Sequence, residues 1–178
     1  MKNYYLGFTC FFFCLLLSAC SSSLKTSVAK TEQQEKVAKL VGMQNFVFEA
    51  TQANPQRISI LNILPNGQQL RNLSPGYFLS VTKDSVKANL PFYGRAYTSN
   101  FNSDDNGIKF NTKDFNYHLK QKRKGVYEIT IILNNVKTAN ELTLDITESG
   151  YATLQVQSIN RDIISFYGDI TSTKTDIL

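Results

Sequence analysis

The sequence predicts a mainly β domain, an antiparallel sandwich or barrel-like fold of about nine strands with one short N-terminal helix. Apolar and polar residues alternate from Asn45 to the C-terminus, which is the period of half-buried strands. Short, turn-rich connections separate the alternating runs, and such connections join antiparallel neighbours. Strands with one apolar face each must close into a barrel or stack as a sandwich, and the sequence leaves both arrangements open.

The chain opens with the three parts of a bacterial lipoprotein signal peptide. Lys2 is followed by an apolar run over 4–17 and then by Leu17-Ser18-Ala19-Cys20, the order that a lipoprotein signal peptidase reads. The apolar run is shorter than the roughly 20 residues that a membrane-spanning helix needs. We therefore predict that residues 1–19 are removed and that Cys20, then the only cysteine, carries the lipid.

Lipidation predicts an address in the bacterial cell envelope, anchored to the outer membrane. Residues 21–25 lack the acidic run associated with surface export, so we expect the domain to face the periplasm. The formal net charge of +5 is modest and mostly spread along the chain, and nucleic acid is not an expected partner. The membrane, through the lipid, is the expected partner, and a protein or small-ligand partner is left open.

One basic cluster departs from this spread. It ends at Gly125, between two strand-like runs, and consists of Lys120, Lys122, Arg123 and Lys124. The cluster is typical of a solvated hairpin tip, and the alternative is contact with anionic head groups.

After Cys20 the sequence predicts two further regions. Residues 20–30 are small and polar and are expected to form a flexible tether without structure, and residues 31–178 form a single domain of ordinary size. Thr31 and Gln34 resemble a capping box, and an apolar stripe of Val37, Leu40 and Val41 follows. A short helix ending near Gly42 is predicted.

The predicted strands share an apolar side chain at every second position. The runs are 46–50, 77–82, 85–90, 115–120, 127–133, 142–146, 152–156 and 164–170. The second and third of these runs flank Lys83-Asp84, which is a strong signal for a hairpin.

Several strings resemble the domain-of-unknown-function 4251 family across nearly all of the chain after Cys20. They are Asn45-Phe46-Val47-Phe48-Glu49-Ala50, Tyr77-Phe78-Leu79, Leu90-Pro91-Phe92-Tyr93-Gly94-Arg95-Ala96-Tyr97, Gly107-Ile108-Lys109-Phe110 and Ser165-Phe166-Tyr167-Gly168. The resemblance implies a secreted or lipid-anchored envelope protein of a Bacteroidetes-type bacterium. It implies no activity, and it assigns no catalytic or ligand residue.

Motifs for catalysis, metal binding or cofactors are weak. His118 is the only histidine and falls on the polar side of its predicted strand, whereas a zinc site needs three or four protein ligands. We predict no catalytic residue, metal site or cofactor.

A partial calcium-loop pattern is present at Asn102, Asp104, Asn106 and Gly107. The pattern fails at Lys113, where a bidentate glutamate would be required, so the segment is interpreted as an ordinary turn.

The best candidate for recognition lies in the segment 91–101. If the segment is extended, Tyr93, Arg95 and Tyr97 share one face, because strand side chains alternate. A guanidinium between two phenol rings could form a cation–π ladder and grip an anionic or sugar ligand. The alternative is self-contained packing.

Taken with the signal peptide, these patterns favour a lipid-anchored, non-catalytic binding or envelope-maintenance module. One alternative is an enzyme whose site assembles only in three dimensions. Another is a carrier of apolar ligands with a cavity inside a barrel.

Overall fold

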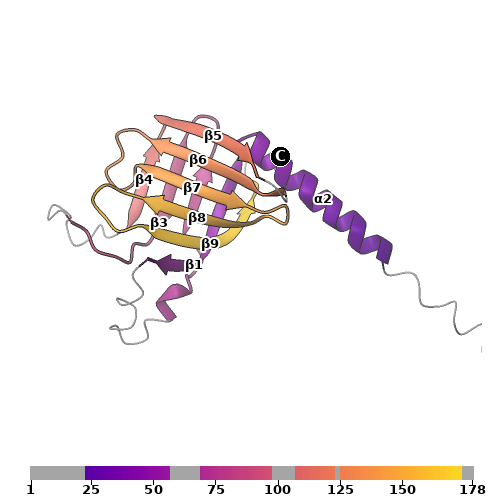
Figure 1. Cartoon of the computed structure of the whole chain (residues 1–178), viewed down its shortest axis with the longest axis horizontal. Helices are drawn as coiled ribbons and strands as arrows, with labels where there is room; N and C mark the ends of the chain where they lie inside the picture. The colour runs from indigo at the N-terminus through magenta and orange to yellow at the C-terminus, as the bar shows by residue number, and fades with distance from the viewer. Residues whose placement is uncertain (1–22, 57–68, 98–106, 123–124, 174–178) are drawn as a thin grey trace, which may run out of the picture.

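The computed structural model describes residues 23–56, 69–97, 107–122 and 125–173. In this part of the chain, nine antiparallel strands form a nearly closed barrel with one N-terminal α-helix, which confirms the predicted class (Figure 1). The elements are α2 (Ser23–Gly42), β1 (Phe46–Pro55), the 3-10 helix η2 (Gln69–Arg71), β2 (Phe78–Val81), β3 (Val86–Leu90), β4 (Ile108–Thr112), β5 (Phe115–Gln121), β6 (Tyr127–Leu133), β7 (Glu141–Ile146), β8 (Tyr151–Gln157) and β9 (Ile164–Thr171).

One continuous ladder joins the strands in the order β4-β3-β2-β1-β9-β8-β7-β6-β5. Each consecutive pair is antiparallel, as the short connections predict, and the hairpin around Lys83-Asp84 joins β2 to β3. The first and last strands of the chain order, β1 and β9, pair at the middle of the ladder. This central pairing produces a single curved sheet, so the barrel is the arrangement of the two that the chain adopts.

The helix α2 begins earlier than predicted. It starts at Ser23, whereas the sequence pattern placed a structureless tether over 20–30 and the helix start at Thr31. The reason is that no glycine or proline stands between Ser23 and Val41, so small polar residues continue the helix toward the N-terminus. Twenty residues correspond to a helix of about 30 Å. It projects away from the barrel in Figure 1.

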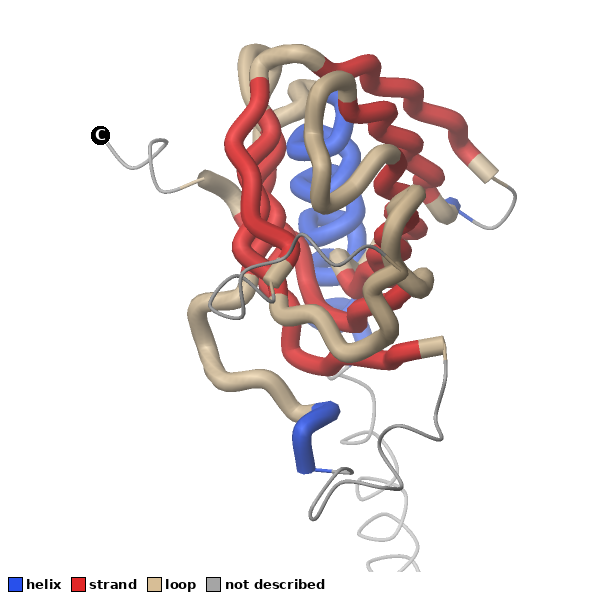
Figure 2. Tube along the Cα trace, turned by 90° about the vertical axis from the view of Figure 1, so that its left-hand side faces the viewer, coloured by secondary structure: helices blue, strands red, loops and turns tan. Residues whose placement is uncertain are grey.

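The C-terminal half of α2 packs against the barrel through its predicted apolar stripe. Val37, Leu40 and Val41 are buried, which confirms that prediction. The hydroxyl of Tyr117 in β5 donates a hydrogen bond to the carbonyl oxygen of Val41 at 3.3 Å. In Figure 2 the helix lies in the background, between the strands on the two sides of the view.

The barrel interior is filled by its own side chains. The inward positions of each strand are buried and the alternate positions are more exposed, as in β8 and β9. The largest fully buried side chains are Phe46, Phe48, Phe166, Leu79, Leu90, Ile108, Ile129, Ile131, Leu142, Leu144 and Ile146. Because they come from both walls, they form one core.

Tyr117 makes the helix contact sensitive to pH. Its burial raises the pKa of the phenol well above the ordinary value of 10.0, because the charged form is the one that burial disfavours. Because the folded state favours the neutral phenol, Tyr117 contributes stability below about pH 10. This contribution is lost as the pH rises further. We expect Tyr117→Phe to lower the free energy of unfolding by about 1 kcal/mol at pH 7. Above pH 10 the difference from wild type should shrink.

Urea unfolding at pH 7 and pH 10.5 measures both effects. A variant that loses stability with pH as steeply as the wild type would show that Tyr117 is not the responsible group.

Candidate functional site

The segment that contains Tyr93, Arg95 and Tyr97 is fastened to the β8–β9 connection. Its described part, 91–97, does not form a regular strand, and within this part only Ala96 makes a β-bridge, with Arg161. Two backbone hydrogen bonds flank the bridge, from Tyr97 N to Asn160 O at 2.8 Å and from Asp162 N to Arg95 O at 3.0 Å. The extended face that the alternation predicted is therefore replaced by a bent segment held at its end.

The three predicted contact residues have different environments. Tyr93 is half-buried against the core, and burial raises the pKa of its phenol. Arg95 is exposed, and Tyr97 is 61% exposed. The hydroxyl of Tyr97 donates to the carboxylate of Asp162, which also accepts from the Arg95 amide at 3.1 Å. The role of the trio in recognition stays a prediction.

The arginine that stacks on a ring in this region is Arg161, which the sequence patterns did not single out. Its guanidinium lies 5.0 Å from the centroid of the Phe92 ring, and its Nη1 donates to the carbonyl oxygen of Gly107 at 3.0 Å. Only 3% of Arg161 is exposed. In the sequence it stands inside Asn160-Arg161-Asp162, which has the composition of a solvated turn. No local signal distinguishes it from a surface arginine.

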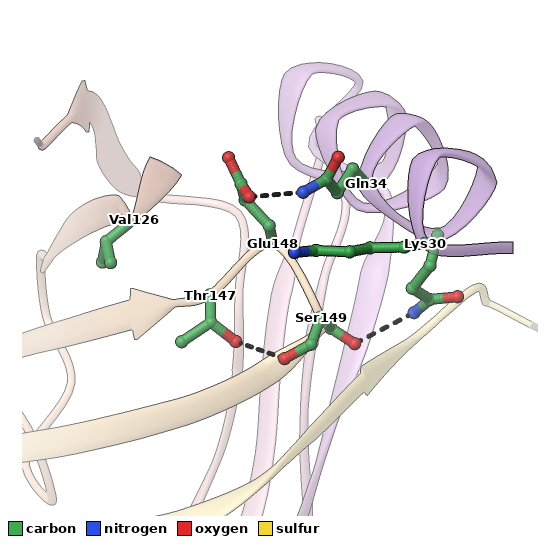
Figure 3. A pocket seen from close by; sticks show the side chains of 7 residues that line it. Lys30, Gln34, Val126, Thr147, Glu148 and Ser149 are labelled. Carbon is green, nitrogen blue, oxygen red and sulfur yellow. Dashed lines mark hydrogen bonds between the residues drawn. The ribbon is translucent and has the colours of Figure 1, made fainter. Parts of the chain in front are cut away.

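A pocket lies where α2 meets the turns of the barrel (Figure 3). Its volume is about 410 Å³, and it is lined by Lys30, Gln33, Gln34, Val126, Thr147, Glu148 and Ser149. Gln34 donates to the Glu148 carboxylate at 2.5 Å, and Gln33 donates to the Ser149 carbonyl oxygen at 3.1 Å. Lys30 extends toward Glu148 across the pocket. The amides thus hold the helix to the β7–β8 turn, and a lysine and a carboxylate face the same space.

Two residues of the basic cluster, Lys120 and Lys122, lie within the described part of the chain. The ladder between β5 and β6 confirms a hairpin, and its Lys122 ammonium forms ion pairs with Glu128 and, at 2.9 Å, with Asp145. The hydrogen bond to Glu128 is the main reason why the pKa of Lys122 is raised. Lys120 is exposed, and Arg123 and Lys124 lie outside the described residues. At least one cation of the cluster is therefore used within the fold.

The remaining sequence candidates are placed as follows. His118 is exposed on β5, opposite Thr130, as its polar position predicted. Cys20 and the loop residues Asn102, Asp104 and Asn106 lie outside the described residues. Within the described ranges, no three His, Cys, Asp or Glu side chains are grouped closely enough to hold a metal ion. The helices of the described part include none that is long and apolar enough to cross a membrane.

Comparison with known proteins assigns the chain to a family. Residues 29–170 match the family described as "Domain of unknown function (DUF4251)". The fold resembles the crystal structure of a DUF4251 family protein from Bacteroides eggerthii DSM 20697, with a TM-score of 0.51, 12% identity, and coverage of 82% of this chain and 91% of that one. No curated protein matches the sequence. The family match spans most of the chain, and the chain therefore belongs to the DUF4251 family.

Proposed function

We propose that this chain is a lipid-anchored protein of the bacterial outer membrane whose barrel is a non-catalytic binding or envelope-maintenance module facing the periplasm. The observation that carries the proposal is the position of α2 relative to Cys20. Only Ser21 and Ser22 separate the candidate lipidation site from a continuous helix that ends on the barrel. The part of this helix that precedes its contact with the barrel at Gln33 would act as a stalk of about 15 Å between lipid and barrel.

The filled barrel interior supports binding at the outer surface. Large side chains such as Phe48 and Phe166 occupy the interior, and both are fully buried. A partner would then meet the outer sheet faces and the connections between strands. Arg95 and Tyr97 are exposed on one such connection, so they remain candidate partner contacts.

The anchor is tested by Cys20→Ala. We expect the variant to remain unprocessed or to leave the membrane fraction, and to lose label from radioactive palmitate, because the thiol is the lipid attachment point. The matched control is Cys10→Ala, which removes a cysteine of the signal peptide and should leave labelling and fractionation unchanged.

Two results would contradict the proposal. The first is a Cys20→Ala protein that still carries palmitate in the outer membrane. The second is rapid digestion of the wild-type protein by proteinase added to intact cells, which would exclude the periplasmic orientation.

A further inference from the structure

Four neighbouring strands place two carboxylates between two aromatic rings in one cross-strand row. In β2, β1, β9 and β8 the register pairs Phe78 with Glu49, Glu49 with Asp169, and Asp169 with Tyr151. Residues directly opposite each other lie on the same face of a sheet, with Cβ atoms roughly 4.5–5.5 Å apart. We call Phe78, Glu49, Asp169 and Tyr151 the acidic row.

The acidic row faces outward. Glu49 and Asp169 are both exposed, whereas their chain neighbours Phe48 and Ile170 are buried in the core. Among the described residues, neither carboxylate of the row takes part in an ion pair, whereas Glu128 and Asp145 pair with Lys122 elsewhere in the fold. Like charges directly opposite each other destabilise a sheet. By this rule, the pairing of Glu49 with Asp169 is unfavourable for the fold, so the presence of two carboxylates here points to a role other than folding.

The aromatic members of the row offer ring faces to a cation. Tyr151 is 45% exposed, and its ring is nearly parallel to that of Tyr167, with centroids 6.5 Å apart and planes inclined by 13°. The Nζ atom of Lys87 already lies 5.9 Å from the centroid of Phe78. The Phe78 ring is thus used by a lysine of the same chain, and the exposed Tyr151 ring lies where a cation–π contact adds to carboxylate pairing.

A small pocket adjoins Glu49. It has a volume of about 230 Å³ and is lined by Glu49, Ala50, Thr51, Leu73, Pro75, Gly76, Tyr77 and Phe78. Backbone hydrogen bonds hold its walls together, from Ala50 N to Tyr77 O at 2.9 Å and from Leu73 N to Thr51 O at 2.8 Å. The pocket is therefore formed by β1 and the segment before β2. It has room for one side chain beside the carboxylate of Glu49.

We propose that the acidic row binds an arginine side chain of a partner protein, an inference that rests on the proposed function as a binding module. A planar guanidinium stacks on phenol rings and donates two parallel hydrogen bonds to a carboxylate. The two negative charges are complementary to it, and the adjacent pocket accepts the aliphatic stem or a neighbouring apolar group. Lysine carries a compact ammonium group without a plane or a fork, so it satisfies the row less well.

The test uses the purified full-length chain in mild detergent, isotopically labelled, and the peptide acetyl-Gly-Arg-Gly-Arg-Gly-amide. NMR titration should shift the backbone amide signals of Gly168 and Asp169. The same peptide with citrulline, which has nearly the same shape and no charge, should produce no shift. Asp169→Asn, Glu49→Gln and Tyr151→Ala should each weaken binding about tenfold or more. The matched control is Asp84→Asn, an exposed carboxylate in the β2–β3 turn, which should bind as the wild type does.

Thermal unfolding separates recognition from a structural role. Because the carboxylates repel each other, Asp169→Asn should raise the unfolding midpoint by about 1–3 °C while it weakens binding. A lowered midpoint would mean that the carboxylate serves the fold and would overturn the proposal. The proposal would also be overturned if the citrulline peptide or a lysine peptide bound as tightly as the arginine peptide. It would be overturned as well if Asp84→Asn weakened binding as much as the variants of the row do. A failure here leaves the palmitate result for Cys20→Ala unaffected, so the two proposals fail separately.

Discussion

Gly168→Ala is expected to lower the free energy of unfolding by about 3 kcal/mol, because the strand beside it leaves no room for a Cβ atom. A Cβ built on Gly168 would lie 1.9 Å from the carbonyl oxygen of Glu49, and that oxygen belongs to the backbone of β1. The ladder between β1 and β9 shifts register between Ala50 and Gln52, next to the pairing of Ala50 with Gly168. Relief of the clash would require separation of the two central strands.

Urea unfolding of the purified chain measures the effect, with Gly42→Ala as the matched control. A Cβ at Gly42 meets no atom within 4 Å, so this variant should unfold within about 0.5 kcal/mol of the wild type. Equal midpoints for the two variants would show that β1 can move away from β9 at little cost. Because Gly168 stands between Tyr167 and Asp169, its loss should also disturb the acidic row.

Arg161→Ala is expected to destabilise the protein by about 3 kcal/mol, whereas Arg95→Ala should change the stability by less than about 0.5 kcal/mol. Arg161 is one partner of the bridge with Ala96, and Arg95 precedes the other partner, but the environments of the two arginines differ. Arg161 is 3% exposed, donates to Gly107 and lies over the Phe92 ring, whereas Arg95 is exposed. The truncated Arg161 would leave the partly buried carbonyl oxygen of Gly107 without this donor and would leave a gap beside the Phe92 ring.

Urea unfolding of both variants, together with limited proteolysis of the segment around Tyr97, checks this comparison. We expect Arg161→Ala to make the segment more susceptible to cleavage, because the bridge that fastens it is weakened. If Arg95→Ala proves to be the more destabilising change, Arg95 has a structural role that its exposure does not reveal.

The strand pattern was predictable because burial of one face requires alternation within each strand. Phe46, Phe48 and Ala50 of β1 are all buried, as their spacing predicted. The stripe of Val37, Leu40 and Val41 was found by the same argument at the helical period. The helix start was placed too late because small polar residues were interpreted as a tether, although the segment contains no helix breaker.

The candidate site was much less predictable than the strands. Arg95 was singled out because alternation brings it between two tyrosines, but the 91–97 segment bends and makes only one bridge. The charge of Arg161 gives no sign of burial, since its burial depends on Phe92 and Gly107, which are remote in the sequence. The acidic row likewise joins strands that are far apart in the chain.

The sequence by itself determined the strand and helix periods, the β2–β3 hairpin and the family, because these depend on neighbouring residues or on strings of residues. Only the tertiary structure decided the barrel, the burial of Arg161 and the meeting of Glu49 with Asp169. These depend on the pairing of β1 with β9, whose contact between Thr171 and Val47 joins residues 124 positions apart. Such a pairing is selected by the packing of all strands around one core, and no local pattern encodes its register.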